Sequence, residues 1–449
     1  MVYTPEINNR INYIFTHVLF RLLKQDFLLT SDKSKFNLHK GPRISYHTDR
    51  SGDELLIIPY GLLNENQVKN QNISVTEWNG IKIFFRVNEQ SDLPFDIFSS
   101  IFYLITRYEE YLPHPVDKYG RFKASQSLAF KNRFHDEPIV EKWVLILKNK
   151  LKEKYPEMIF HEKEFQFQST IDIDNPFAFL HKGLLRTLGA FLKSTLKLDI
   201  KSFSNRILTL KGSRKDPYET YDYINDIEKK YRFRSVYFFL VGDYKKYDTN
   251  ISIRKIVYQN LIGNVHKGHK IGLHSSFSST RNLKILREEK QRLSKVINGP
   301  ITRCRQHYLT LKMPDTYQRF IEAGIREDYS MGYANFPGFR AGTCNPFNFY
   351  DLSREHETNL IVYPFQVMEV ALHNYMQLNN EDAIKQIFKI IDEVKKVNGL
   401  FISLWHNESL SEYDMWTGWR VVFEKMVKYA TDIVKSQSVK KEAHQKISL

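Results

Sequence analysis

The sequence predicts an α/β protein in which a smaller mixed α/β N-terminal domain precedes a larger domain, a barrel or an incomplete barrel of parallel strands and helices. The length of 449 residues suits two or three domains. Between residues 165 and 406, segments with helical spacing of apolar residues alternate with short strand-like segments, as in parallel α/β proteins. Residues 1–160 show a less regular mixture of helix and strand patterns.

The N-terminal region contains helix and strand patterns but no motif that we can connect to chemistry. The expected helices are 10–28, 97–112 and 138–154, and the expected strands are 55–62 and 81–87. Arg107, Glu109 and Glu110 are a concentrated group of charges in this region, and we interpret them as an ion-pair network on a helix face. We therefore expect residues 1–160 to form a domain of unknown function.

The larger region begins with the clearest strand pattern of the chain. In FQFQSTIDID, residues 165–174, apolar and polar residues alternate, so Asp172 and Asp174 share a face. The later expected strands are 235–241, 270–274, 301–308 and 400–406, and the expected helices are 219–231, 252–266, 281–298 and 381–397. We assign residues 161–430 to this domain and residues 431–449 to a C-terminal tail.

The composition excludes several classes of protein. Hydrophobic residues make up 42% and charged residues 26%, so the chain is neither collagen-like nor wholly disordered. Two cysteines, Cys304 and Cys344, exclude a disulfide-rich scaffold and a zinc site of four cysteines. The N-terminus lacks the pattern of a signal peptide, and no run of about 18 apolar residues is present. We therefore expect a soluble, cytoplasmic protein.

The basic charge of the chain is concentrated in one segment. Lys and Arg number 66 against 51 Asp and Glu, a net charge of +15, and residues 181–215 hold nine basic side chains against one acid, Asp199. Leucines and basic residues in this segment are spaced as in helices that lie on membrane surfaces. A peripheral membrane contact and an insertion that packs on the barrel rim both fit this pattern. We find no nucleic-acid-binding motif and expect no nucleic-acid partner.

Four of the expected strands end in side chains that bind metals or transfer protons. Asp172 and Asp174 are two residues apart on one strand, which places both carboxylates on one face, about 6–7 Å apart. The other three strands end in His274, in Arg305 and His307, and in His406. Because the carboxyl ends of barrel strands converge on one face, we expect these side chains to form a single site.

The order of these motifs resembles that of a known enzyme family. TIDID, GLHSS, RCRQH and SLWH, within residues 165–425, are similar to the motifs of polysaccharide deacetylases of carbohydrate esterase family 4, the NodB-like chitooligosaccharide-deacetylase type. That resemblance implies an incomplete (β/α) barrel. The stretch FDIFSSIFYLITRYEEYLP resembles an uncharacterised domain that precedes deacetylase-like domains in some bacterial proteins, and no activity follows from this second resemblance.

The resemblance implies a catalytic role for several residues. Asp172 corresponds to the general base and His406 to the general acid of the family. Arg305 corresponds to the arginine that holds the base, and Arg340, in GFRAGT, competes for this role. Asp328 lies near the position of the acid that the family keeps behind its catalytic histidine, although an ordinary turn residue is also expected there.

The resemblance also implies a metal site, with two departures. Asp174 and His274 correspond to metal ligands of the family. The second metal histidine would fall at position 278, which is Ser278 here, and His307 is the best replacement. In addition, Ile173 separates two acids that are usually adjacent in the family. A divalent metal would then be held by Asp174, His274 and His307, and Zn²⁺ is the favoured candidate.

We therefore expect a metal-dependent deacetylase that removes acetyl groups from a glycan or glycan precursor. The N-acetyl group is the favoured target. An acetylated oligo- or polysaccharide would be the substrate. Two alternatives remain open on the sequence. Ser278 and the separated acids favour a deacetylase-like glycan-binding protein with impaired catalysis, and the basic charge favours a protein that binds anionic surfaces.

Overall fold

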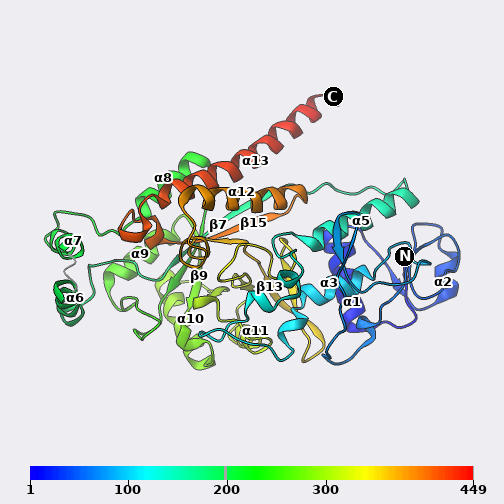
Figure 1. The fold of residues 1–449 in the computed structure, drawn as a ribbon, viewed down its shortest axis with the longest axis horizontal. Helices are drawn as coiled ribbons and strands as arrows, with labels where there is room; N and C mark the ends of the chain where they lie inside the picture. The colour runs from blue at the N-terminus through cyan, green and yellow to red at the C-terminus, as the bar shows by residue number, and fades with distance from the viewer. Residues whose placement is uncertain (197–199, 448–449) are drawn as a thin grey trace.

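The computed structural model describes residues 1–196 and 200–447, apart from the side chains of residues 193–195, 201 and 440–447. The molecule is elongated, with the N-terminal region at one end and the large sheet in the middle (Figure 1). Helices α6 (Leu184–Leu196) and α7 (Ile200–Leu210) lie at the other end. The strands of the described residues form three sheets, of four, nine and two strands.

The N-terminal region is built around a small parallel sheet of the order β2-β1-β3-β4. Its strands are β1 (Val2–Tyr3), β2 (Leu29–Thr30), β3 (Ile44–Tyr46) and β4 (Leu55–Ile57), and a separate hairpin consists of β5 (Thr76–Trp78) and β6 (Ile81–Ile83). The helices are α1 (Asn9–Phe15), which a π-helical segment (Thr16–Leu22) continues, α2 (Lys33–Leu38), α3 (Ile97–Ile105), α4 (Leu128–Lys131) and α5 (Ile139–Lys154).

The expected elements of this region are present, and four of the five are shorter than the sequence pattern. The expected strand 55–62 ends at Ile57, two residues before Pro59, which has no N–H to donate to a ladder. The expected helix 97–112 ends at Ile105 because Arg107 adopts a left-handed backbone with φ 55°. Strands β1 to β3 have two or three residues each, too few for a period-two pattern, and the sequence did not predict them.

The large sheet has the strand order β12-β13-β11-β10-β9-β8-β7-β15-β14. Its strands are β7 (Gln166–Ile173), β8 (Val236–Leu240), β9 (Lys270–Ser275), β10 (Arg303–Gln306), β11 (Glu327–Asp328), β12 (Phe347–Asp351), β13 (His356–Val362), β14 (Val367–Met368) and β15 (Leu400–His406). Strand β12 runs antiparallel to β13, and all other neighbours are parallel. Edge strands β12 and β14 do not pair with each other among the described residues, so the sheet is open.

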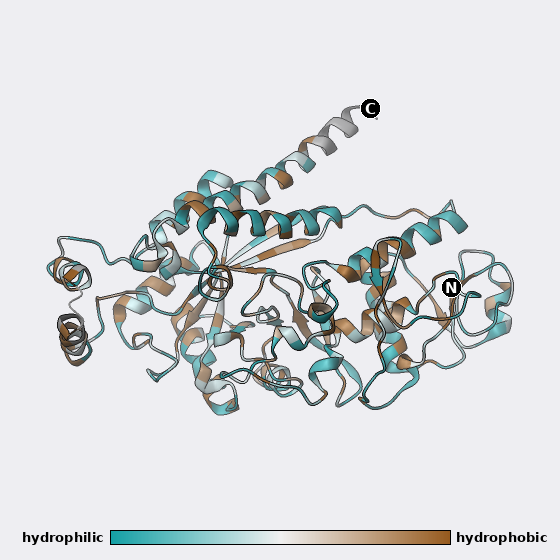
Figure 2. Cartoon of the chain, in the orientation of Figure 1, coloured by the Kyte–Doolittle hydropathy of each residue, from teal (hydrophilic) through white to brown (hydrophobic). Residues whose placement is uncertain are grey.

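Helices cover this sheet in alternation with its strands, as the sequence predicts for residues 219–308 and 381–406. No element was predicted for residues 309–380, which contain a helix and the strands β11 to β14. The helices are α8 (Tyr221–Tyr231), α9 (Ile256–His266), α10 (Leu283–Ile297), α11 (Asp315–Glu322), α12 (Asn380–Lys396) and α13 (Trp419–Ile447). Figure 2 shows mostly hydrophobic residues on the central strands and a mixture of hydrophobic and hydrophilic residues on the helices around them. None of the helices in the described part of the chain is long and apolar enough to cross a bilayer.

One hydrophobic core extends through both regions of the chain. The ring of Tyr350 on β12 lies 5.0 Å from that of Tyr13 and 5.3 Å from that of Phe102, which belong to α1 and α3. Arg10 of α1 also hydrogen bonds to the carboxylate of Glu355. The predicted boundary at residue 160 therefore does not separate two independent cores.

The C-terminus differs from the tail that the sequence predicts from residue 431. Helix α13 continues without a break to Ile447. Its first half is anchored by Phe423, Met426, Val427 and Ala430, all of which are fully buried. The last turns extend away from the rest of the molecule (Figure 1).

Candidate metal centre and active site

Five neighbouring parallel strands, in the order β15-β7-β8-β9-β10, bring the predicted residues to one end of the large sheet. His406 is paired with Asp172, and His274 is paired with Arg305. Residues that are paired across a ladder point to the same face of the sheet, as do residues two apart on one strand. Motifs far apart in the sequence therefore meet on one face, at the carboxyl ends of the strands.

A glycine on β9 allows Arg305 to reach across the sheet. Gly272 is paired with Phe238 of β8, and a Cβ at this position would lie 2.4 Å from the phenyl ring. The guanidinium of Arg305 lies over that ring, 4.5 Å from its centroid, and donates to Asp172 at 2.7 Å. Strands β10 and β7 would be about 14 Å apart in a flat sheet. The sheet therefore curls towards the face that carries these side chains.

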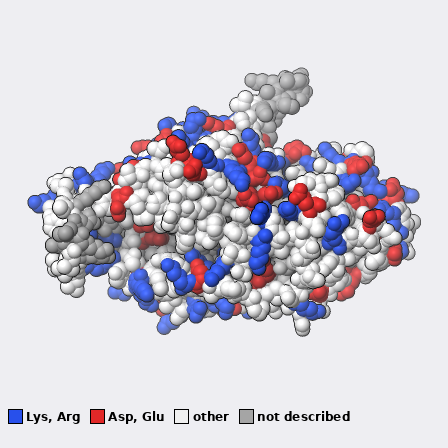
Figure 3. Space-filling view, in the orientation of Figure 1, with Lys and Arg blue, Asp and Glu red and all other residues white. Residues whose placement is uncertain are grey.

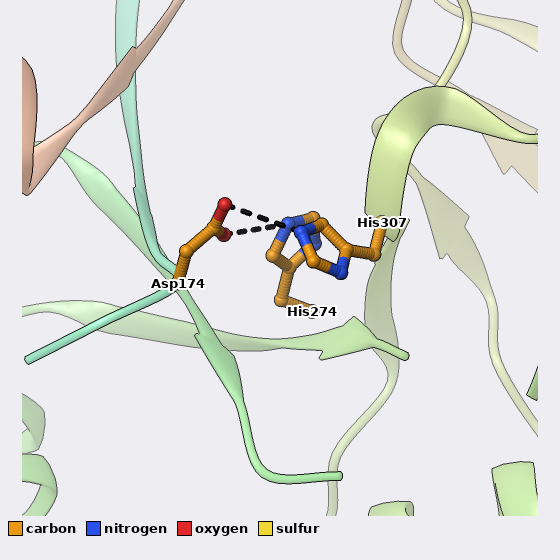
Figure 4. Close-up of side chains that lie close together, drawn as sticks. All are labelled: Asp174, His274 and His307. Atoms are coloured by element: carbon orange, nitrogen blue, oxygen red, sulfur yellow. Dashed lines mark hydrogen bonds and ion pairs between the residues drawn. The ribbon is translucent and has the colours of Figure 1, made fainter. Parts of the chain in front are cut away.

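Asp174, His274 and His307 form the one group of at least three metal-ligating side chains found among the described residues (Figure 4). The carboxylate of Asp174 faces both imidazoles, with Oδ1 3.1 Å from Nε2 of His274 and Oδ2 3.2 Å from Nε2 of His307. The two histidines are buried, and Asp174 retains 20% exposure. This set offers one oxygen and two nitrogens, which suits zinc or a similar divalent cation.

The outer hydrogen bonds of both histidines support this assignment. Nδ1 of His274 lies 2.9 Å from the carbonyl oxygen of Arg305, and Nδ1 of His307 lies 2.9 Å from Oδ1 of Asp248. Both partners are acceptors, so each Nδ1 carries a proton and each Nε2 faces the carboxylate of Asp174. The carboxylate oxygens and the Nε2 atoms are so close that a proton or a cation must lie between them. Metal-binding histidines are held by such partners in general.

The electrostatics of the group point in the same direction. Burial would raise the pKa of Asp174, but the charge of His307 and hydrogen bonds from both imidazoles hold that pKa well below its usual range. Burial would lower the pKa of His307, yet Asp174 and Asp248 raise it to about 9. The site thus stabilises positive charge at Nε2 of His307, the atom that would coordinate a metal ion.

Asp172 lies beside the predicted metal ligands. Its Oδ1 accepts the hydrogen bond from Arg305, and its Oδ2 lies 3.6 Å from Nε2 of His274. Asp172 and Arg305 are almost completely buried. The guanidinium therefore engages one oxygen of the carboxylate, and the other oxygen faces the predicted metal position.

His406 lies close to Asp174, with its Nε2 4.0 Å from Oδ2 of that residue. Its Nδ1 lies 2.8 Å from Oε1 of Glu369. The backbone N–H of His406 donates to the same oxygen. Burial would lower the pKa of His406, but Glu369, followed by Asp174 and Asp172, raises it to about 10. His406 is therefore a protonated imidazole near neutral pH, oriented by a buried carboxylate.

Sequence reasoning missed three acids that the structure brings to this site. Glu369 follows the short strand β14, and Asp248 lies in the loop after β8, where no motif marks it. Glu408 comes two residues after His406 and lines the same cavity. Burial, and then the charge of Asp174, raise the pKa of Glu408 to about 7. Glu369 could have been found by the rule that predicted the other residues, because it is an acid at a strand end.

Arg340 does not reach the site. Its guanidinium donates to both carboxylate oxygens of Glu110, at 2.9 and 2.7 Å. Arg107 binds the same carboxylate, and all three residues are buried. The choice between Arg305 and Arg340 as the partner of Asp172 is therefore resolved in favour of Arg305. The predicted ion-pair network on a helix face is a buried network that joins the N-terminal region to the rest of the chain.

Two further residues that the sequence singled out, Asp328 and Ser278, make supporting hydrogen bonds. Asp328 is a turn acid, as one of the two expectations for it had it: it accepts hydrogen bonds from the hydroxyl of Tyr317 at 2.6 Å and from the backbone N–H of Ser330 at 3.0 Å. Ser278, at the position of the family's second histidine, donates to Asp248 at 3.0 Å. Ser278 therefore supports the acid that orients His307.

The site opens into a cavity of about 240 Å³. Asp172, Asp174, His274, His307 and His406 lie in its wall, together with the aromatic residues Tyr308, Tyr375 and Trp416. Arg121 of the N-terminal region completes the wall and donates to the carbonyl oxygen of Tyr308 and to the hydroxyl of Tyr375. Of the tryptophans near the last strand, Trp405 and Trp419 are core residues, and only Trp416 lines the cavity.

Comparison with known proteins gives one family match. Residues 1–156 match DUF7033, a family of unknown function. This match covers about a third of the chain. No curated protein matches the sequence significantly.

Several solved structures are similar to the larger region at low sequence identity. A polysaccharide deacetylase (putative) from Mycobacterium smegmatis is 12% identical, with a TM-score of 0.41, over 64% of this chain and 94% of that chain. A polysaccharide deacetylase from Bacillus cereus is 10% identical, with a TM-score of 0.30, over 62% and 89%. An allantoinase is 11% identical, with a TM-score of 0.37, over 59% and 84%. Similarities at this level do not establish a shared activity.

Proposed function

We propose that this chain is a metal-dependent deacetylase, which hydrolyses the carbon–nitrogen bond of an N-acetyl group on a glycan or glycan precursor. One observation carries the proposal. In a single cavity, a carboxylate held by an arginine and a protonated histidine held by a carboxylate lie beside a three-ligand cation site. A base, an acid and a Lewis acid in this arrangement are the groups that amide hydrolysis needs.

Asp174, His274 and His307 would hold the metal, for which Zn²⁺ is the first candidate because of the nitrogen and oxygen donors. When bound, such an ion polarises the acetyl carbonyl and lowers the pKa of water towards ~7. The histidines hold their ligand atoms in place through Arg305 and Asp248.

Asp172 would act as the general base. Its Oδ1 is engaged by Arg305, so Oδ2 is the oxygen that accepts a proton from the attacking water. Because Arg305 is itself fixed by the carbonyl oxygen of Tyr329, the position of the base is set before substrate binds.

His406 would act as the general acid. The attack of water forms a carbon–oxygen bond at the acetyl carbon. Collapse of the tetrahedral adduct then breaks the carbon–nitrogen bond, and the leaving nitrogen takes the proton from Nε2 of His406. Nδ1 of this ring faces Glu369 and keeps its own proton, so Nε2 is the atom that can transfer one. The products are acetate and a free amine, and the proton taken up by Asp172 balances the one that His406 gives.

A sugar as substrate follows from the resemblance of the motifs and from the aromatic wall of the cavity. Tyr308, Tyr375 and Trp416 present rings beside the acid and the base. Aromatic side chains combine a large apolar surface with a polar edge, which suits the faces of pyranose rings. The alternative, a glycan-binding protein without catalysis, would use the same cavity.

The test measures metal content and acetate release on the purified full-length chain, with a panel of N- and O-acetylated oligosaccharides. We expect about one equivalent of bound metal, which is lost in Asp174→Ala and His274→Ala but kept in the control His356→Ala, an exposed histidine far from the site. Acetate release should fall by at least about 10²-fold in Asp172→Asn and in His406→Ala. A wild type that folds and binds these sugars but releases no acetate with Zn²⁺, Co²⁺ or Mn²⁺ would establish the binding protein instead.

A further inference from the structure

Helices α6 and α7 lie side by side at the end of the molecule opposite to the N-terminal region (Figure 1). Helix α6 exposes a row of large apolar side chains. The leucine stripe, as we name it here, consists of Leu184, Leu185, Leu188, Leu192 and Leu196, which are between 63% and 87% exposed. Leucines four residues apart lie on one side of a helix. Residues 197–199, between the two helices, lie outside the described part of the chain.

Two contacts hold α6, one from Arg186 and one from Phe191, which lies three residues after Leu188 at the edge of the stripe, and the leucines themselves remain exposed. Arg186 donates to the backbone carbonyls of Thr249 and Asn250, which holds the start of the helix against the loop after β8. Phe191 packs against Phe203 of α7 with ring centroids 5.2 Å apart. The two helices therefore have a small apolar contact of their own, and the leucine stripe is not needed to form it.

The surroundings of the stripe are basic. Residues 181–215 contain nine Lys and Arg side chains and one acid, and Lys211, Arg214 and Lys215 are exposed. Lys and Arg side chains flank this end of the molecule in Figure 3. In the loop that Arg186 contacts, Lys245 and Lys246 are exposed, and Tyr244 is 59% exposed. An apolar helix face with lysines, arginines and a tyrosine beside it has the composition of interfacial membrane helices.

We propose that the leucine stripe docks the protein on the surface of a bilayer that contains anionic lipids. The leucines would enter the boundary between head groups and acyl chains, and the basic residues around them would attract the anionic head groups. A second copy of this chain fits the leucine stripe less well than a bilayer does, because two such basic segments would bring like charges together. A contact in the plane of the membrane also needs no helix that crosses it.

The docking surface lies next to the rim of the cavity. Thr249, whose carbonyl oxygen binds Arg186, directly follows Asp248, which orients His307, and Asn175, directly after Asp174, donates to Thr249. A bound bilayer would therefore lie close to the mouth of the site. If the proposed deacetylase activity holds, its substrate would be a glycan carried at that surface. Binding to vesicles does not depend on this activity.

The test is co-sedimentation of the full-length chain with vesicles of phosphatidylcholine alone and with added phosphatidylglycerol. The variant Leu188→Gln/Leu192→Gln removes two apolar side chains without changing the charge. Leu38→Gln/Ile159→Gln is the matched control, because these two residues are 75% and 80% exposed in the N-terminal region. We expect wild type and control to bind the anionic vesicles, and the stripe variant to bind at least about tenfold more weakly. Raising the salt concentration should weaken wild-type binding.

Two results would overturn the proposal. Equal binding of the stripe variant and wild type would mean that adsorption is electrostatic and that the leucines take no part in it. A wild type that binds neither kind of vesicle but forms a dimer that the stripe variant loses would assign the stripe to self-association. Acetate release from a soluble substrate should be the same in wild type and stripe variant, so the outcome is independent of the proposed function.

Discussion

Replacement of Arg340 by methionine tests whether this arginine has a structural rather than a catalytic role. Arg340 donates two hydrogen bonds to Glu110, which is 4% exposed, and Arg107 donates a third. Arg340→Met keeps an unbranched side chain of similar length but leaves the buried carboxylate with one cation instead of two. We expect a large loss of stability and no loss of acetate release per folded molecule.

The pKa of Glu110 gives the size of this effect. Burial would raise the pKa, but Arg340, and then Arg107, lower it from 4.5 to about 2. One pKa unit corresponds to about 1.4 kcal/mol, so the charged partners of Glu110 stabilise the fold by about 3 kcal/mol. Breaking a buried pair from one side costs ~3–5 kcal/mol in other proteins. We therefore expect Arg340→Met to lower the free energy of unfolding by about 3 kcal/mol.

Urea unfolding at pH 7, followed by the fluorescence of buried tryptophans, measures this change. The control is Arg354→Met, because Arg354 is half exposed and its nitrogen lies 4.0 Å from Asp351, a contact worth at most about 1 kcal/mol. The folded-state pKa of Glu110 is depressed, so its contribution is complete above pH 4.5 and is lost as the pH falls from 4.5 to about 2. The difference between wild type and Arg340→Met should shrink in that range.

The opposite pattern would refute this reasoning. A variant that unfolds like wild type at pH 7 but no longer releases acetate would place Arg340 in the catalytic site. The double variant Glu110→Gln/Arg340→Met adds a second criterion. It removes both buried charges and leaves Arg107 paired with Glu109, so its loss should be smaller than the sum of the single losses.

Three further predictions concern the architecture of the site. Gly272→Ala should lower the free energy of unfolding by ~1–3 kcal/mol, because the new Cβ would lie 2.4 Å from the ring of Phe238; an unchanged Tm would contradict the packing described. Glu369→Gln should lower the pKa of His406 from about 10, since Glu369 is its strongest negative partner, and NMR titration of the imidazole measures this; a constant pKa would mean that other groups hold the proton. Asp248→Asn should weaken metal binding about 10–100-fold in competition with a chelator, and equal affinities would show that this carboxylate does not support His307.

Much of the larger region could be predicted from the sequence because its elements are long and regular. Strand β7 follows from clean alternation of apolar and polar residues, and α12 and β15 follow from a helical pattern and an apolar run that succeed one another. Short strands carry too few residues for a period, which is why the small N-terminal sheet was missed. The shared core was missed for a different reason: contacts such as Tyr13 with Tyr350 join residues that are far apart in sequence, and no local pattern reports them.

The residues that face the cavity were easier to predict than those that hold them in place. Asp172, Asp174, His274 and His406 each end a recognisable strand, so parallel topology alone predicts that they meet. The selection of Arg305 over Arg340 required the structure, because it depends on where Glu110 is buried. Asp248 lies in the loop segment GDYKKYD, in which several polar residues are equally plausible and only the fold determines which one reaches His307.

The serine at position 278 explains how a histidine from a neighbouring strand can replace the expected ligand. Asp248 accepts the hydroxyl and the backbone N–H of Ser278 on Oδ2, and the backbone N–H of Phe277 on Oδ1. That same Oδ1 lies 2.9 Å from Nδ1 of His307, so the turn after β9 fixes the acid that orients the ligand at the end of β10. A histidine at position 278 would remove one of these hydrogen bonds and free the ring of His307. Ser278 and His307 therefore form one arrangement, and the missing histidine is not by itself a sign of a lost metal site.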